Sequence, residues 1–193
     1  MSKTQKLTKI SILAAAAYLI MFLEFPLPLF PDFLKIDLSD VPALFAAFAF
    51  GPIFGVVVEA LKNLLHLITK SGGTLGIGEF ANFIVGSSLV YTAGALYKRD
   101  KTKKGAVLSL ISGVLVMTVV ASVANYYVFL PLYEKVLHFP IKAVVEITSK
   151  VNKAVVDLNT LIVYSIMPFN LIKGTIASIV TFVLYKKLHS VIK

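Results

Sequence analysis

Asn170 and Lys173 lie three residues apart in residues 168–174, within the last long apolar segment of the chain. This spacing puts both side chains on one face of a helix. A lysine inside a bilayer costs at least ~2.5–3.5 kcal/mol, and such residues normally serve a site or pair with an acid. Three roles are open for Lys173: binding a ligand together with Asn170, pairing with Glu59 or Glu79, or extending toward the head-group layer.

A second set of polar residues has helical spacing within residues 53–69. Glu59, Lys62, Asn63 and His66 fall at i, i+3, i+4 and i+7, which makes one polar stripe on an otherwise apolar helix. Such a stripe should face the interior of a helical bundle. It could join helices through a Glu59–Lys62 pair, or it could contact a ligand.

Three further polar side chains lie near the ends of apolar segments. Glu79 and Asn82 are again three residues apart, and Asn125 is followed by two tyrosines. Glu79 could stabilise a helix N-terminus, where a carboxylate is favourable. Asn125 could simply hydrogen-bond to a neighbouring helix. A shared pocket for these side chains is the functional alternative.

The residue inventory favours binding over catalysis. The chain has no cysteine, and its three histidines are far apart in sequence, so neither a thiol nucleophile nor a metal site is expected. No pairing of a nucleophile with a base is apparent, and no ATP-binding motif occurs. Amide, amine and carboxylate groups flanked by aromatic residues suit a neutral, planar, hydrogen-bonding molecule. We therefore expect a protein that is not an enzyme, carries no cofactor, and depends on a partner for energy.

The elements that must position these residues are transmembrane helices. Of the 193 residues, 58% are hydrophobic and 15% are charged, against about 25% charged in soluble domains. The mean hydropathy is +0.86. We predict an all-α integral membrane bundle that forms a single domain over residues 1–193. Its six predicted spans are 8–26, 41–52, 53–69, 78–97, 106–130 and 161–185. The first apolar run lacks a cleavage site and should be retained.

The positions of the basic residues predict the topology. Eleven of the nineteen basic residues fall on one side of the six predicted spans, with Asp100 as the only acid. They are Lys3, Lys6, Lys9, Lys98, Arg99, Lys101, Lys103, Lys104, Lys186, Lys187 and Lys193. Both termini should therefore be cytoplasmic. The net charge of +9 is then a signal of topology and of contact with anionic lipid head groups, and no nucleic-acid partner is expected.

The connections between spans carry their own predictions. Residues 26–40 contain three prolines, which exclude a continuous helix. This segment could be a lid over an outward-facing pocket or a plain connector, and Ser39 or Asp40 could cap the next helix. Residues 132–160 should form an external loop with a short amphipathic helix. In the first span, Ser11 and Ala15 could pack within the chain or admit a partner helix.

Five strings, taken together and in order, resemble one family over essentially the whole chain. They are Lys-Ile-Asp-Leu-Ser-Asp-Val-Pro-Ala-Leu (35–44), Phe-Gly-Pro (50–52), Lys-Asn-Leu-Leu-His (62–66), Gly-Glu-Phe-Ala-Asn-Phe (78–83) and Pro-Phe-Asn-Leu-Ile-Lys-Gly (168–174). The chain resembles the riboflavin-specific S components of energy-coupling factor (ECF) transporters. The resemblance implies a multi-pass protein of the bacterial cell membrane that captures riboflavin outside. It would then dock onto a transmembrane coupling protein (the T component) and two ATP-hydrolysing subunits.

The resemblance also assigns roles to residues. It places Asn125, Asn170 and Lys173 at the vitamin, under the loop after the first span. An asparagine amide and a lysine can meet the carbonyl and N–H groups of an isoalloxazine. Asp40, Glu79 and Asn82 are candidates for the ribityl hydroxyls.

Ser11 and Ala15 match the family's Ala-xxx-Ala docking motif, with serine in place of the first alanine. The alternatives are an S component for thiamine or folate, or a small membrane enzyme acting on lipids.

Overall fold

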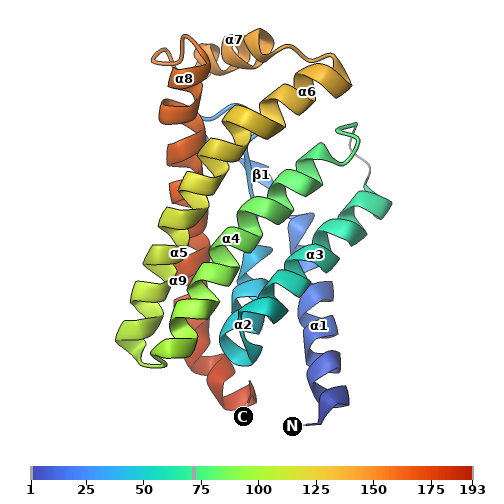
Figure 1. Cartoon of the computed structure of the whole chain (residues 1–193), viewed down its shortest axis with the longest axis vertical. Coiled ribbons are helices and arrows are strands. Elements are labelled where there is room, and N and C mark those ends of the chain that lie inside the picture. The colour runs from blue at the N-terminus through green and yellow to red at the C-terminus, as the bar shows by residue number, and fades with distance from the viewer. Residues whose placement is uncertain (1, 71–72, 193) are drawn as a thin grey trace.

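The computed structural model describes residues 2–70 and 73–192, with side chains up to residue 185. It is an elongated bundle of helices, with both termini at the same end (Figure 1). Lys193 and the side chains of Lys186 and Lys187, which belong to the predicted basic end, lie outside the described part of the chain.

The secondary structure is almost wholly helical. The first half of the chain contains α1 (Lys3–Met21), α2 (Asp40–Phe50), α3 (Pro52–Thr69) and α4 (Ile77–Arg99). The second half contains α5 (Lys103–Ala124), η1 (Asn125–Phe129), α6 (Leu130–Leu137), α7 (Ile141–Val151), α8 (Leu158–Leu161), η2 (Ile162–Ile166) and α9 (Met167–Ile192). The segments η1 and η2 are π-helical turns inside longer helices. One short antiparallel pair, β1 (Phe25–Pro26) with β2 (Lys35–Ile36), lies in the connection after α1.

Each of the six predicted spans coincides with a helix, but not every one of these helices is a candidate to cross a membrane. Within the described residues, four helical stretches are long and apolar enough, namely 52–69, 77–99, 103–137 and 158–185. Helix α2 has 11 residues, which is about 16 Å at ~1.5 Å per residue and short of a ~30 Å bilayer core. Helix α1 is not among these four, because the polar residues in its first turns lower its mean hydropathy.

Two boundaries differ from the prediction. Helix α1 ends at Met21 rather than near residue 26, because the Pro26 segment is extended and pairs with β2. The helix predicted to end at residue 130 continues through α6 to Leu137, so the stretch between the last two long helices begins later than expected. The short helix predicted within that stretch is α7.

Gly51 separates α2 from α3 without a loop. Its φ is +110°, a conformation that favours glycine, and Pro52 follows at the first turn of α3. The predicted Phe-Gly-Pro turn is therefore confirmed, and it allows two helices to follow each other with one residue between them.

Helix α2 is the centre of the bundle. Every residue from Asp40 to Phe48 is buried, as expected for a helix surrounded on all sides. It contacts α1, α3, α4 and α9, while α5 packs between α4 and α9 (Figure 1). Asp40 starts this helix, so its carboxylate lies inside the bundle.

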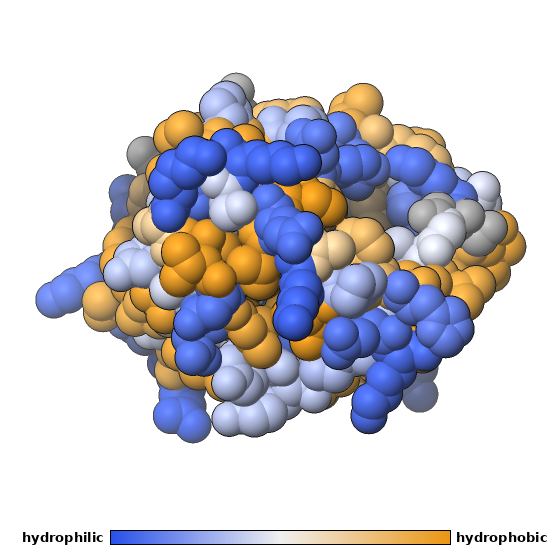
Figure 2. Space-filling view, turned by 90° about the horizontal axis from the view of Figure 1, so that it is seen from above, coloured by the Kyte–Doolittle hydropathy of each residue, from blue (hydrophilic) through white to orange (hydrophobic). Residues whose placement is uncertain are grey.

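The far end of the molecule is formed by α6, α7 and α8. This end is opposite to the two termini (Figure 1). Figure 2 looks down on it and shows hydrophilic side chains spread around apolar ones.

Candidate functional site

Lys173 is buried on α9 and forms an ion pair with Asp37, which lies in the connection between α1 and α2. The distance from Lys173 Nζ to Asp37 Oδ2 is 3.1 Å. The burial of Lys173 was predicted, but its partner is neither Glu59 nor Glu79. Asp37 Oδ1 also accepts a hydrogen bond from the backbone N–H of Ser39 at 2.8 Å.

The pKa of the Asp37 carboxyl lies below its ordinary value. Burial raises this pKa, but the ammonium groups of Lys173 and Lys62 and the hydrogen bonds with Ser39 lower it by more. Asp37 is therefore held as a carboxylate, and it keeps a negative charge beside Lys173.

Lys62 on α3 is the centre of a second buried ion cluster. Its Nζ lies 2.5 Å from Asp40 Oδ1, 2.9 Å from Glu59 Oε2 and 2.8 Å from Ser39 Oγ. The predicted Glu59–Lys62 pair is confirmed. Neither Ser39 nor Asp40 caps α2 as predicted, because both side chains turn to the Lys62 ammonium instead.

The buried carboxylates outnumber the buried ammonium groups. Asp37, Asp40 and Glu59 face Lys62 and Lys173, which leaves one negative charge in excess if all five are ionised. A net charge in a low-dielectric interior is costly. Glu59 Oε1 has no hydrogen-bond partner among the described residues. One proton shared by the cluster, most simply on Glu59, would make it neutral.

A glycine gives this cluster its space on the α4 side. A Cβ built on Gly86 would lie 2.5 Å from Glu59 Oε2 and 3.3 Å from Asp40 Oδ1. The backbone of α4 therefore packs directly on the two carboxylates, and a larger residue at position 86 would displace them.

Glu79 and His66 form a third polar contact, between α4 and α3. His66 Nδ1 lies 3.0 Å from Glu79 Oε1, and Thr74 Oγ1 donates to Glu79 Oε2 at 3.4 Å. All four residues of the polar stripe on α3 are buried, as predicted. Glu79 lies in the first turn of α4, as predicted for a carboxylate at a helix N-terminus. It also pairs with His66. Asn82 follows one turn later and is partly buried.

Asn125 and Asn170 both donate to their own helices. Asn125 Nδ2 donates to the Ala121 carbonyl and Asn170 Nδ2 to the Ile166 carbonyl, each at 2.8 Å. Both lie beside π-helical turns, because Asn125 starts η1 and Ile166 ends η2. Such turns occur often at functional sites. The two turns also contact each other, which brings the two asparagine regions together across the bundle.

The turn before Asn170 is supported by the side chain of Asn152, the residue that follows α7. Pro168 has no N–H and cannot donate to the Tyr164 carbonyl four residues earlier. Asn152 Nδ2 donates to that carbonyl at 3.0 Å. The segment after α7 therefore stabilises the irregular helix near Asn170.

The connection between α1 and α2 is held over α9 at several points. The rings of Phe30 and Phe169 are 5.6 Å apart and edge to face, one turn from the Asp37–Lys173 pair. At its other side, Glu24 accepts hydrogen bonds from Lys35 and Lys70 at 2.9 Å each. Burial raises the pKa of Glu24, but these two lysines lower it by more. This segment covers the face of α9 that carries Asn170 and Lys173.

The structure thus gathers some predicted site residues and separates others. Asp40 and Lys173 belong to neighbouring ion pairs, whereas Glu79 pairs elsewhere with His66. Asp37 was missed as a site residue, although it lies in one of the strings that carried the family resemblance. Ser11 and Ala15 are exposed on α1, while Ala14 and Ala17 face the core. Packing of Ser11 and Ala15 within the chain is therefore excluded.

Comparison with known proteins gives one consistent family. Residues 5–185 match the family model "ECF transporter, substrate-specific component". The riboflavin transporter RibU of Staphylococcus aureus (strain TCH60) is 39% identical over 193 residues, covering 100% of this chain and 95% of the relative. The riboflavin transporter FmnP of Bacillus subtilis (strain 168) is 39% identical over 189 residues, covering 96% of this chain and 93% of the relative.

A solved structure gives the same result for the fold. It is described by the words "Structure and mechanism of the S component of a bacterial ECF transporter", is 38% identical, and superposes with a TM-score of 0.79. The match covers 100% of this chain and 99% of the solved one.

Proposed function

Because the chain belongs to the family of substrate-specific components of ECF transporters, we propose that it captures riboflavin for uptake into the cell. The observation that carries the proposal is the full-length likeness at 39% identity to two proteins named as riboflavin transporters. The chain is a multi-pass protein of the bacterial cell membrane and a transport protein rather than an enzyme. Riboflavin is its transported ligand and not a cofactor.

The flavin ring would be held by Asn170, Lys173 and Asn125. The pyrimidine edge of an isoalloxazine presents carbonyl acceptors beside an N–H donor. The Asn170 amide can accept and donate, and the Lys173 ammonium can donate to a carbonyl oxygen. The contact between the two π-helical turns supports this arrangement, since it brings the regions of Asn125 and Asn170 to one place. Phe30 and Phe169 offer aromatic faces beside them.

The ribityl hydroxyls would be bound by Asp40, Glu79 and Asn82. Asp40 lies on the central helix α2, and Glu79 and Asn82 lie on α4, which packs against it. The carboxylates of Asp40 and Glu79 are both buried. Because Asp40 and Glu79 already have partners, a bound hydroxyl would share these carboxylates rather than replace the ion pairs. The connection between α1 and α2 would act as a lid over the site.

The topology in this proposal has six transmembrane segments in a single domain over residues 1–193. Helices α1 and α2 would be the first two, and α2 would be held at membrane depth by the helices around it. Both termini would be cytoplasmic, which the basic residues near the termini and in the α4–α5 connection support. The α6–α8 end would then be the mouth through which riboflavin enters.

Energy would come from a module made of the T component and two ATP-hydrolysing subunits. The sequence contains no ATP-binding motif of its own. Ser11 and Ala15 form an exposed small-residue surface on α1, where another helix can approach closely. We propose that this surface docks on the T component.

Two alternatives are less well supported. S components for thiamine or folate would share the fold, but the two relatives above are both named as riboflavin transporters. A lipid enzyme would need a nucleophile or an acid–base pair, and the buried acids among the described residues, Asp37, Asp40, Glu59 and Glu79, are engaged with lysines or histidine.

The deciding experiment is titration of the purified protein with riboflavin, thiamine and folate. We expect saturable quenching of flavin fluorescence with riboflavin, and no competition by thiamine or folate. Displacement of the flavin by thiamine, or the absence of saturable quenching, would overturn the proposal.

A further inference from the structure

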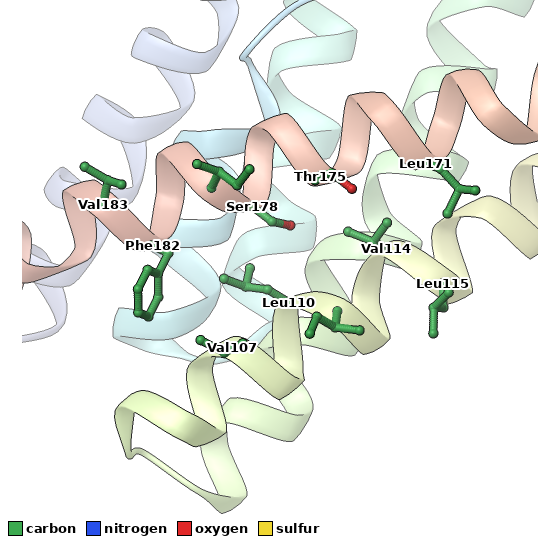
Figure 3. A pocket seen from close by; sticks show the side chains of 11 residues that line it. Val107, Leu110, Val114, Leu115, Leu171, Thr175, Ser178, Phe182 and Val183 are labelled. Carbon is green, nitrogen blue, oxygen red and sulfur yellow. The ribbon is translucent and has the colours of Figure 1, made fainter.

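An apolar groove runs along the side of the molecule between α5 and α9. Its volume is about 370 Å³, and it is lined by aliphatic and aromatic side chains with two hydroxyl residues. Its walls include Val107, Leu110 and Val114 from α5, and Ser178, Phe182 and Val183 from α9 (Figure 3). It is separate from the ion cluster, because Lys173 and Ala177 are on the buried face of α9, whereas the groove opens beside exposed residues such as Val183.

The groove is long and narrow. On α5 its lining extends from Val107 to Leu115, which is about 12 Å at ~1.5 Å per residue. A helix ~10 Å across would fill roughly 900 Å³ over that length, which is more than the groove's volume of about 370 Å³. A helix could insert only side chains into this space, whereas a single hydrocarbon chain could lie along it.

Two lysines continue the groove at the end near the termini. The lining positions on α5 recur every three or four residues, and Lys103 and Lys104 precede Val107 by four and three. They therefore lie on the same stripe of the helix. Both lysines are exposed, and neither forms an ion pair with a carboxylate of the described chain. The start of α5, which carries them, lies at the end of the molecule that holds both termini (Figure 1).

Charge decides which membrane component fits. An apolar groove facing lipid gains nothing from the hydrophobic effect when an acyl chain enters it, since bulk lipid is equally apolar. Selectivity must come from packing and from the head group. Basic sites between transmembrane helices at a membrane surface attract anionic head groups. We propose that an anionic glycerophospholipid binds here, with one acyl chain in the groove and its phosphate at Lys103 and Lys104.

The proposal predicts a lipid that stays with the purified protein. Such a lipid would tie the start of α5 and the end of α9 to one leaflet. This inference requires a membrane-spanning chain, but it does not depend on which vitamin is carried.

The test is native mass spectrometry of the detergent-purified full chain titrated with phosphatidylglycerol and phosphatidylcholine. We expect phosphatidylglycerol to bind at least about tenfold more tightly, since each lysine near a surface adds to the attraction for anionic lipid. The double variant Lys103→Glu/Lys104→Glu should lose that preference. Val107→Trp, which fills the groove next to the lysines, should weaken phosphatidylglycerol binding as well.

The matched control is Lys3→Glu/Lys6→Glu, an equal charge reversal at the same end on α1. It should keep the preference, and riboflavin titration of every variant reports whether the protein is folded. Equal binding of the two lipids by the unaltered chain would overturn the proposal. If Val107→Trp binds phosphatidylglycerol as tightly as the unaltered chain, the acyl chain does not lie in the groove. If the groove variant instead fails to assemble with the partner module while lipid binding is unchanged, the groove is a contact surface for a partner helix.

Discussion

Asp37 and Lys173 are 136 positions apart in the chain, yet their side chains meet inside the bundle with Oδ2 and Nζ 3.1 Å apart. The pair joins the connection after α1 to the middle of α9. It satisfies a charge that would otherwise be buried alone, and it sets the position of the ammonium next to Asn170. The proposed lid and the proposed flavin contact are therefore mechanically linked.

Replacement of Lys173 by alanine should weaken riboflavin binding by about 1.5–3 kcal/mol, the usual value of a hydrogen bond to a charged group. Fluorescence titration in detergent measures this loss. The double variant Asp37→Asn/Lys173→Ala separates two causes, because it leaves no unpaired carboxylate at position 37. If the double variant recovers the original affinity, the loss in Lys173→Ala came from the unpaired Asp37 carboxylate, and Lys173 does not contact the flavin. The exposed Lys142→Ala serves as control.

The stability provided by Asp37 should depend on pH. Its folded pKa is lowered, so its contribution is fully present above the ordinary pKa of about 3.9. It is then lost as the pH falls toward the lower folded pKa. The difference in unfolding temperature between the wild type and Asp37→Asn, measured between pH 6 and pH 3, should therefore shrink toward pH 3. A constant gap over that range would mean that Asp37 is not held as a carboxylate.

Glu59→Gln and Asp40→Asn should differ although both remove one carboxylate near Lys62. If Glu59 carries the proton that neutralises the cluster, glutamine keeps both shape and charge, and we expect a cost below about 1 kcal/mol. Asp40→Asn removes the carboxylate that accepts a hydrogen bond from Lys62, at about 1.5–3 kcal/mol. Removing both should cost ~3–5 kcal/mol, because Lys62 is then left buried without an acid.

Chemical unfolding of the purified variants measures these differences. The reverse order, with Glu59→Gln the more damaging single change, would show that Glu59 is the ionised partner of Lys62.

Ala15→Trp should spare riboflavin binding and block uptake. Ala15 is exposed on α1, so a bulky side chain there leaves the core unchanged but prevents close approach of another helix. Uptake of labelled riboflavin by cells that express the whole transporter, compared with binding by the purified variant, gives the two measurements. Val119→Trp is the control, since Val119 is also exposed but lies on α5. Normal uptake with Ala15→Trp would exclude this face as the docking surface.

Much of this architecture could be predicted because helical periodicity is a local property. The stripe of Glu59, Lys62, Asn63 and His66 indicated one buried face, and the structure buries all four. Phe50, Gly51 and Pro52 indicated a turn, and the backbone at Gly51 takes a conformation that favours glycine. The amino-acid composition was sufficient to predict a membrane protein, and the five strings of residues were sufficient to predict its family.

The partners of the buried charges could not be predicted, because they depend on how distant segments meet. Lys173 pairs with Asp37 rather than Glu59 or Glu79, since the connection after α1 crosses α9 at that level. For the same reason, the Ser39 hydroxyl accepts a hydrogen bond from Lys62 and does not cap the N-terminus of α2. The π-helical turns beside Asn125 and Asn170 leave no periodic signal. Sequence alone therefore determined the family of the chain and the buried face of the helix that carries Glu59, Lys62, Asn63 and His66. Tertiary packing decided which buried charge faces which, because a low-dielectric interior makes each ion take the nearest counter-charge that the fold provides.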